Sequence, residues 1–364
     1  MINFGSGPAQ FPKEVLEKIQ AGLKNYKQSG ASILELPHRG EWIQNMIHKA
    51  NRLVREILEL PDNFKVLWMQ GGGRMQFHLL PLNFLKKDQN AQFVVSGHWA
   101  KQAYLEALRQ GKAEIIASSE AISYTSVPSI NTEDIIKKVD KNTAYLYYCS
   151  NNTIYGTQIK HFARHPNVPL IADMSSDIFT RRLNFSNFDM LFAVAQKNIG
   201  AAGVTMVIIK EEFLQKANIN LPDILSYKAF SQQNSTVNTP PVFSIFTAVC
   251  MLEWIKEKEL KNLEKENLIK ARRFYDFLDN STHFEGTASK ESRSFTNITF
   301  RLKNRSIDET EEILNYLKEK SIFGVAGHRF IGGFRIALYN GITLENVEKL
   351  IAILALYEKE IKGL

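Results

Sequence analysis

The stretch that decides the fold reads Val66-Leu67-Trp68-Met69-Gln70-Gly71-Gly72-Gly73-Arg74-Met75. Its apolar start predicts a short buried strand, its glycines predict a turn, and residues 75–85 predict a helix. A strand, a glycine turn and a helix in this order indicate an α/β protein. The glycines would let backbone amides approach an anion at the helix N-terminus, although such turns are also common without a ligand. The turn is not a phosphate loop of the Walker type, because no Gly-Lys-Ser/Thr follows.

Further short apolar runs predict more strands, and most end at polar or small residues. Continuous apolar runs are typical of strands that are buried on both faces, as in parallel sheets. Ligands of such sheets bind beyond the strand ends, so the polar clusters there are the candidate site. The runs are Phe93–Val95, Ala144–Tyr148, Leu170–Ala172, Met190–Ala195 and Val204–Ile209. The clusters that follow four of them are Ser96-Gly97-His98-Trp99, Ser150-Asn151-Asn152-Thr153, Asp173 and Gln196-Lys197.

The composition changes after Trp254, and the later pattern predicts a second, smaller unit. We expect helices and strands that alternate and pack on one antiparallel sheet. The expected elements are a long charged helix over 255–277, a strand with an exposed face over 295–302, a helix over 309–320, a strand over 333–339 and a final helix over 344–362.

Composition excludes several other classes of protein. The 364 residues carry a net charge of +7, but no run of five basic residues, zinc-finger spacing or RNA-recognition signature indicates nucleic acid. An anionic small substrate remains open. Cys149 and Cys250 are far apart and predict reduced thiols, and His161 and His165 lack a third ligand, so we expect no metal. The chain shows no signal peptide and no apolar run long enough to cross a membrane, which favours a cytoplasmic protein.

Lys197 and Asp173 each follow a predicted strand. Taken singly, a lysine or an aspartate at such a place is usually a surface or turn residue. Together with a glycine-rich anion site on a third strand, they supply what pyridoxal phosphate needs. These needs are an amine for a Schiff base, a carboxylate beside the pyridine nitrogen, and a cradle for the phosphate.

The segment Ala195–Gly203 closely resembles the cofactor-lysine segment of phosphoserine aminotransferases, which are class V, fold-type I pyridoxal phosphate enzymes. Further motifs resemble family segments in the family's order, and the resemblance runs from Phe4-Gly5-Ser6-Gly7-Pro8 almost to the end of the chain. They are Pro37-His38-Arg39-Gly40, Gly71–Phe77, Ala172–Ser176, Asn238-Thr239-Pro240-Pro241 and Gly327–Arg335.

This resemblance implies roles at the cofactor's ring. Lys197 would form the Schiff base and move the proton during catalysis, and Asp173 would pair with the pyridine nitrogen. Trp99 would stack on the ring with its flat apolar face. Thr153 would form a hydrogen bond near the phenolic oxygen of the cofactor.

The resemblance also implies the residues that hold the cofactor's phosphate. They are Gly73, Arg74 and Gln196 from one subunit and Asn238 and Thr239 from a second subunit. The site would therefore require a homodimer.

On the substrate side the resemblance implies a cluster of cations. Arg39 and Arg335 would bind carboxylates, with Arg335 on the α-carboxylate, because the planar fork of arginine matches that group. His38, His328 and Arg329 would meet the phosphate of one substrate or the side-chain carboxylate of glutamate.

The implied architecture is a large cofactor-binding domain, residues 15–254, with a mainly parallel seven-stranded sheet. Residues 255–364 would form a smaller α/β domain, on which residues 1–14 pack. The implied reaction is a ping-pong transamination in serine biosynthesis, from L-glutamate and 3-phosphohydroxypyruvate to 2-oxoglutarate and O-phospho-L-serine. A related step that forms 4-phosphohydroxy-threonine in vitamin B6 synthesis is also expected.

Two departures and three alternatives accompany this interpretation. Ser150-Asn151-Asn152-Thr153 stands where many relatives have Pro-Asn-Glu-Thr, and Ala201 stands where some have proline. One alternative is a class V transaminase of unphosphorylated substrates, and another is a basic binding protein with a decayed site. The third is a cysteine desulfurase, but Cys149 and Cys250 lie in an expected strand and helix rather than in a mobile loop.

Overall fold

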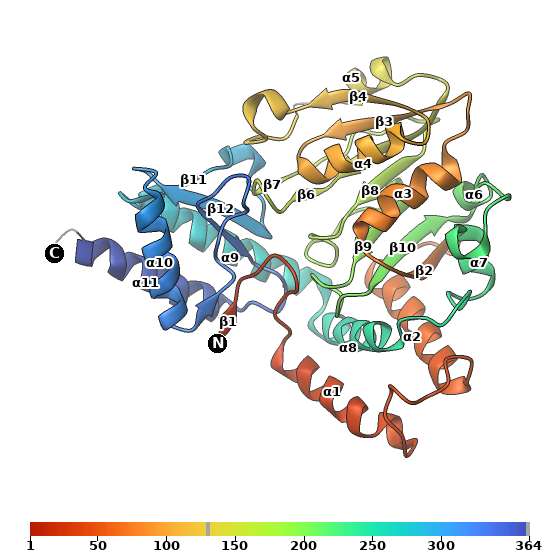
Figure 1. Ribbon diagram of the computed structural model, residues 1–364, viewed down its shortest axis with the longest axis horizontal. Coiled ribbons are helices and arrows are strands. Elements are labelled where there is room, and N and C mark those ends of the chain that lie inside the picture. The colour runs from red at the N-terminus through yellow and green to blue at the C-terminus, as the bar shows by residue number, and fades with distance from the viewer. Residues whose placement is uncertain (129–131, 362–364) are drawn as a thin grey trace.

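A seven-stranded sheet forms the centre of the computed structural model, which describes residues 1–128 and 132–361 (Figure 1). Its strand order is β2-β10-β9-β8-β5-β3-β4, and within this sheet β10 runs antiparallel to both neighbours while the remaining pairs are parallel. The strands are β2 (Phe64–Gln70), β3 (Asn90–Val95), β4 (Lys112–Ser118), β5 (Thr143–Cys149), β8 (Leu170–Asp173), β9 (Met190–Val194) and β10 (Val204–Lys210). The predicted α/β fold with a mainly parallel seven-stranded sheet is confirmed.

The sheet is covered by helices on both faces, as the alternation of side chains along β2 shows. Val66 and Trp68 belong to a core with residues of α1, α2 and α8, whereas Leu67 and Met69 belong to a second core with residues of α3, α4 and α7. The helices are α1 (Lys13–Lys24), α2 (Glu41–Ile57), α3 (Gly73–Phe84), α4 (His98–Leu108), α5 (Thr132–Lys138), α6 (Glu211–Leu214), α7 (Tyr227–Gln232) and α8 (Val242–Lys258).

Strand β4 is one strand that the sequence analysis missed. It lies at the edge of the sheet, beside β3, and most of its residues are not fully buried. An edge strand needs no continuous apolar run, because one side faces solvent.

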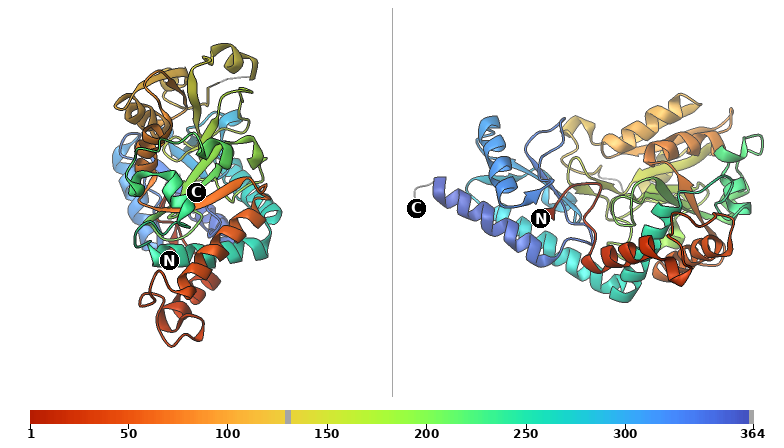
Figure 2. Two further views of the ribbon diagram at one scale, coloured as in Figure 1. Left: turned by 90° about the vertical axis from the view of Figure 1, so that its right-hand side faces the viewer. Right: turned by 60° about the horizontal axis from the view of Figure 1, so that its bottom comes forward.

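The C-terminal part of the chain forms a three-stranded antiparallel sheet with its own core, beside the central sheet (Figure 2). Its elements are α9 (Leu260–Asn280), β11 (Phe284–Gly286), β12 (Asn297–Leu302), α10 (Ile307–Glu319), β14 (Phe334–Ala337) and α11 (Leu344–Ile361). Lys362, the expected end of the last helix, lies outside the described residues. At the other end of the chain, β1 (Ile2–Asn3) pairs with β13 (Ile322–Phe323), and Ile2 and Phe4 belong to this core. The domain boundary after Trp254 stays a prediction.

The long helix expected over 255–277 is wrong as a single element. Helix α8 continues to Lys258, Glu259 has a φ of 62°, and α9 begins at Leu260. A left-handed residue cannot continue a right-handed helix. The change in composition after Trp254 therefore falls inside α8, where Trp254 and Ile255 are still buried in the core beside the central sheet.

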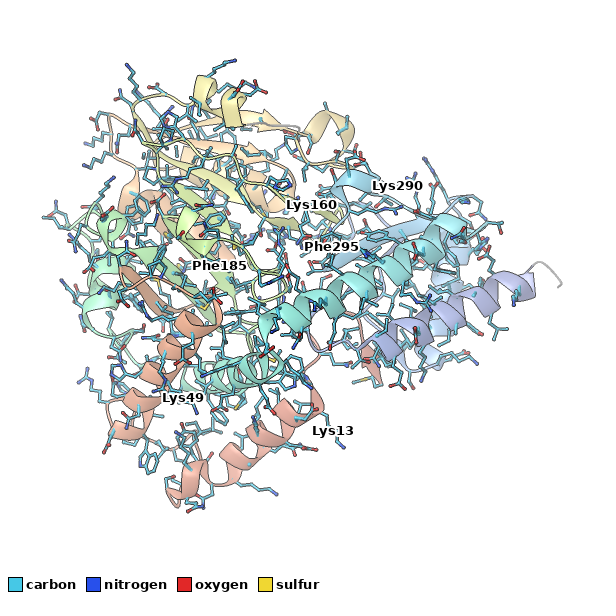
Figure 3. The ribbon with its side chains drawn as sticks, turned by 180° about the vertical axis from the view of Figure 1, so that it is seen from behind. Lys13, Lys49, Lys160, Phe185, Lys290 and Phe295 are labelled. Carbon is cyan, nitrogen blue, oxygen red and sulfur yellow. The ribbon has the colours of Figure 1, made fainter. Side chains whose placement is uncertain are left out.

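The exposed face expected for the strand over 295–302 is also wrong. Strand β12 lies between β11 and β14, and five of its six residues are buried. Its polar residues face the rest of the chain: Thr299 Oγ1 donates to the Tyr155 carbonyl at 2.9 Å. Nearby, Lys160 and Phe295 lie together where the two parts of the chain meet (Figure 3), with Lys160 Nζ 5.1 Å from the centroid of the ring.

Candidate active site

A cavity of about 330 Å³ lies beyond the ends of the central strands. Asp173 is the last residue of β8, and Lys197 follows β9 by three residues, so both reach the same edge of the sheet. Six of the predicted site residues line the cavity: Gly73, Arg74, Trp99, Asp173, Gln196 and Lys197.

Lys197 and Asp173 perturb each other inside this cavity. Burial lowers the pKa of the Lys197 amine, and the nearby Asp173 carboxylate opposes that shift. Burial likewise raises the pKa of Asp173, against the effects of Lys197 and of hydrogen bonds from Ser175. The Ser175 backbone N–H donates to Asp173 Oδ1 at 2.9 Å, which fixes the carboxyl group. A lysine with a lowered pKa offers more neutral amine, the form that attacks a carbonyl.

The glycine turn brings a helix N-terminus to the same cavity. Gly71 has a φ of 100°, which glycine adopts without strain, and its N–H donates to the Gly203 carbonyl at 3.0 Å. Helix α3 begins at Gly73, two residues before the expected start, so its first unpaired N–H groups face the cavity beside Arg74. Such a terminus favours an anion.

Trp99 and Thr153 meet at the wall of the cavity. The Trp99 indole Nε1 donates to Thr153 Oγ1 at 3.3 Å, and this bond orients the flat ring. Gly97, two residues before Trp99, lets the start of α4 lie close to Asn152, because a Cβ at this position would lie 2.3 Å from Asn152 Oδ1. The structure thus brings Thr153 to the site although it does not line the cavity itself.

Arg335 reaches the site from β14. Its Nη1 donates to the Thr153 carbonyl at 3.2 Å, while its Nε is buried without a hydrogen-bond partner among the described residues. Burial lowers the pKa of Arg335, but a guanidinium keeps its charge in proteins. A partly buried cation with a free donor is suited to bind a carboxylate.

The loop before β14 brings His328 and Arg329 close to Arg335. Burial lowers the pKa of His328, and the positive charges of Arg335 and Arg329 and a nearby imidazole, that of His98, act in the same direction. Phe330 packs against both histidines, with ring centroids 4.6 Å from His328 and 5.3 Å from His98. The loop therefore folds back toward the N-terminus of α4.

His98 is a residue of this region that the sequence analysis quoted without giving it a role. Burial lowers its pKa first, and the charges of Arg74, Arg329 and Lys101 lower it further. It therefore lies between the predicted phosphate cradle and the predicted substrate cluster. In the sequence, only its position beside Trp99 indicated that His98 could belong to the site.

The cavity wall also contains residues that were not predicted. Two of them, Ser175 and Ser176, lie in the motif quoted around Asp173, and Asn151 lies in the cluster before Thr153, so the motifs contained a signal for them. Cys149 is the buried last residue of β5. The unpredicted wall residues are Gly72, Phe77, Cys149, Asn151, Ser175, Ser176 and Val194.

Eight predicted residues do not line this cavity: Thr153, His328, Arg329 and Arg335, described above, and four on other segments. His38 and Arg39 lie in the turn before α2, and Asn238 and Thr239 lie before α8; among the described residues none of them lines the cavity. Hydrogen bonds link the turn at His38 to Asn234, four residues before Asn238. The Gln44 side chain donates to the His38 carbonyl at 3.0 Å and accepts from the Asn234 side chain at 3.3 Å.

Two further findings concern metals and membranes. The described residues contain no group of three histidine, cysteine or acidic side chains arranged to hold a metal ion. They also contain no helix that is both long and apolar enough to span a lipid bilayer.

Comparisons with known proteins show which family the chain resembles. The family model "Aminotransferase class-V" matches residues 1–350. The phosphoserine aminotransferase of Bacillus subtilis (strain 168) is 40% identical over 360 residues, which cover 98% of this chain and 98% of the relative. A solved structure that concerns radiation damage of the Schiff base in phosphoserine aminotransferase has a TM-score of 0.94 at 37% identity, and 99% of each chain is covered. The PLP-bound phosphoserine aminotransferase from Trichomonas vaginalis has a TM-score of 0.89 at 30% identity, over 97% of this chain and 99% of that one.

The fold is thus that of class V aminotransferases. The chain belongs to this class and, within it, to the phosphoserine aminotransferase family. The resemblance found in the sequence is confirmed, and the protein is an enzyme.

Proposed function

We propose that the protein binds pyridoxal 5'-phosphate in the cavity at Lys197 and uses it to transfer an amino group. The observation that carries this proposal is one cavity that joins a buried amine, a buried carboxylate and a helix N-terminus. These are the groups that the cofactor's aldehyde, pyridine nitrogen and phosphate require. When bound, the cofactor supplies an electron sink for the bond that breaks at the substrate's α-carbon.

Each residue of the chain would then have a defined task. Lys197 would hold the cofactor covalently and carry the proton that leaves the substrate's α-carbon. Asp173 would keep the pyridine nitrogen protonated, and Trp99, oriented by Thr153, would cover the ring. Gly73, Arg74 and Gln196 would bind the phosphate, since all three line the cavity.

The substrates that we propose are L-glutamate and 3-phosphohydroxypyruvate, which give 2-oxoglutarate and O-phospho-L-serine by a ping-pong route. Arg335, with its free buried Nε, would bind the α-carboxylate of either substrate. His328 and Arg329 would bind the second anion, which is a phosphate in one half-reaction and a carboxylate in the other. A substrate of 4-phosphohydroxy-threonine type carries the same two anions, so we propose the corresponding step of vitamin B6 synthesis as a second activity.

We also propose that the enzyme is a homodimer in which Asn238 and Thr239 complete the partner's phosphate site. Because Gln44 and Asn234 link the turn at His38 to the segment before Asn238, the same dimer would place His38 and Arg39 at the partner's substrate cluster. We place the enzyme in the cytoplasm and in serine biosynthesis. Two buried free cysteines are compatible with a reducing compartment.

The experiment that tests the proposal uses purified protein incubated with pyridoxal phosphate. We expect a visible absorption band that borohydride removes, and turnover of phosphohydroxypyruvate with glutamate. Lys197→Ala should lose both. A protein without the band would refute the cofactor, and faster turnover of the unphosphorylated keto acid would assign the enzyme to another branch of class V.

A further inference from the structure

Buried asparagines connect the C-terminal sheet to the wall of the cavity. We use the name asparagine network for five asparagines that share hydrogen bonds across this boundary. They are Asn151, Asn198, Asn267, Asn297 and Asn340, and each is buried. Buried amides need hydrogen-bond partners, so the positions of these residues depend on one another.

One arm of the asparagine network begins on α9 and ends beside Lys197. The Asn267 side chain donates to Asn340 Oδ1 at 3.0 Å. The Asn340 backbone N–H donates to Asn198 Oδ1 at 3.1 Å, and Asn198 Nδ2 donates to the Ser176 carbonyl at 3.2 Å. Because Asn198 directly follows Lys197, this arm fixes the backbone that carries the amine.

The second arm begins on β12 and reaches the cavity wall directly. Asn151 Nδ2 donates to Asn297 Oδ1 at 2.8 Å and to Ser176 Oγ at 2.8 Å. Ser294 Oγ donates to Asn151 Oδ1 at 2.5 Å. Both Asn151 and Ser176 line the cavity. The two arms therefore converge on Ser176, three residues after Asp173.

Asn340 also holds a strained residue of the segment that follows Asp173. Phe179 is buried and has a φ of 60°, an unfavourable conformation for a bulky side chain. Asn340 Nδ2 donates to the Phe179 carbonyl at 2.9 Å, and Asn267 Nδ2 donates to the neighbouring Thr180 carbonyl at 3.0 Å. The network thus stabilises a conformation that the local sequence would not adopt unaided.

Asn340 follows β14 by three residues, and β14 carries Arg335. The network therefore connects the strand of the proposed carboxylate-binding arginine to the loop of the proposed cofactor lysine by hydrogen bonds. Electrostatics connects the same pair, because the charge of Arg335 contributes to lowering the pKa of Lys197.

We propose that Asn198 and Asn340 are positioning residues that fix the position of Lys197 relative to Arg335. The amine then faces the α-carbon of a substrate that Arg335 binds by its carboxylate. This inference rests on the proposed aminotransferase function. Neither asparagine lines the cavity, so both act through Lys197 and the Ser176 segment.

The test compares Asn198→Ala and Asn340→Ala with wild type and with Asn262→Ala, each reconstituted with pyridoxal phosphate. Asn262 is a matched control because it is an exposed asparagine of α9 that bonds only to nearby residues. One readout is the pH at which the visible absorption band changes, which reports the protonation of the lysine–cofactor linkage without turnover. The other is the separation of kcat from the KM for glutamate.

We expect both test variants to shift the spectroscopic pKa by about one unit and to lower kcat about tenfold, with a smaller change in KM. The control should match wild type. The inference would be overturned if Asn198→Ala kept the spectrum and kcat of wild type. It would also be overturned if the variant lowered only the melting temperature and changed neither readout. If Asn198→Ala does not fold, Asn340→Ala decides the question, since it removes the side-chain bonds to the Phe179 carbonyl and from Asn267 while the backbone N–H still bonds to Asn198. An inactive, colourless wild type would instead refute the proposed function.

Discussion

The Trp99 indole donates a hydrogen bond to the Thr153 hydroxyl at 3.3 Å, and the Thr153 carbonyl accepts a bond from Arg335. One buried threonine therefore contacts both the residue proposed to cover the cofactor ring and the residue proposed to bind the substrate. Its side chain accepts the bond from Trp99, and its backbone carbonyl accepts the bond from Arg335. The two functions can be separated by mutation.

Thr153→Val removes the hydroxyl but keeps the side-chain shape and the carbonyl. We expect weaker cofactor binding, by about 1 kcal/mol or five- to tenfold in Kd, because the indole loses its acceptor. The KM for glutamate should change little, since Arg335 keeps its bond. Titration of the apoprotein with cofactor measures the effect, and Thr125→Val, at an exposed threonine, is the control. Unchanged cofactor affinity would contradict this role of Thr153.

His98 and His328 should make anion binding depend on pH. The lowered pKa of each imidazole reflects burial and the surrounding cations, namely Arg74, Lys101, Arg329 and Arg335. A bound dianion offsets those charges and raises the pKa of both groups, so binding takes up protons and weakens as pH rises.

Sulfate is a suitable probe because it stays dianionic between pH 5 and about 9. We expect its affinity, measured by calorimetry, to fall by up to about tenfold per pH unit for each imidazole that titrates. His98→Gln should reduce the slope, whereas His78→Gln, at a histidine paired with Glu106, should not. A slope that His98→Gln leaves unchanged would exclude His98 from the anion site.

Cys149 should be chemically silent although it lines the cavity. Burial and the nearby Asp173 raise the pKa of its thiol well above the ordinary value, so little thiolate forms at neutral pH. We expect no alkylation of native protein by iodoacetamide at pH 8, and Cys149→Ala should keep activity within about threefold. Loss of turnover, or release of sulfide from cysteine by the wild type alone, would favour the desulfurase alternative.

Lys270 should stabilise the fold rather than take part in catalysis. Its buried amine lies within hydrogen-bonding distance of the carbonyls of Leu338, Tyr339 and Ile342, at 3.3, 3.3 and 2.7 Å, and the protonated form donates to all three. Lys270→Met would leave these three carbonyls without this donor, and we expect a loss of about 2–4 kcal/mol in the free energy of unfolding. Lys265→Met, at an exposed position of α9, should stay within about 0.5 kcal/mol of wild type.

The same lysine also predicts a pH dependence of stability. Burial lowers the pKa of Lys270 to about 7, whereas the unfolded chain keeps a lysine pKa of about 10.4. Between these values the unfolded state binds more protons, so the contribution of Lys270 to stability rises with pH, by at most about 1.4 kcal/mol per unit. Denaturant unfolding at pH 6 to 9 measures this, and Lys270→Met should remove the slope. A parallel pH profile in the variant would contradict the assignment.

Much of the candidate site was predictable from sequence because parallel strands deliver their ends to one edge of the sheet. Asp173, Lys197 and the glycine turn each follow an apolar run, so their meeting required only the α/β pattern. Polar residues inside buried strands were harder to interpret. Asn297 and Thr299 alternate with apolar residues and so predicted an exposed face, yet they contact the other part of the chain.

The sequence by itself determined the chemical groups of the site and the strand that each of them follows along the chain. Short-range patterns specify strands, turns and helices. Tertiary structure alone decided which residues of the C-terminal part come to lie beside those strand ends. Asn151 and Asn297 are 146 residues apart in the chain and bond at 2.8 Å, and His98 comes within reach of His328 only when the loop before β14 folds back. No local pattern specifies such pairs, because they depend on how two separately formed cores pack against each other.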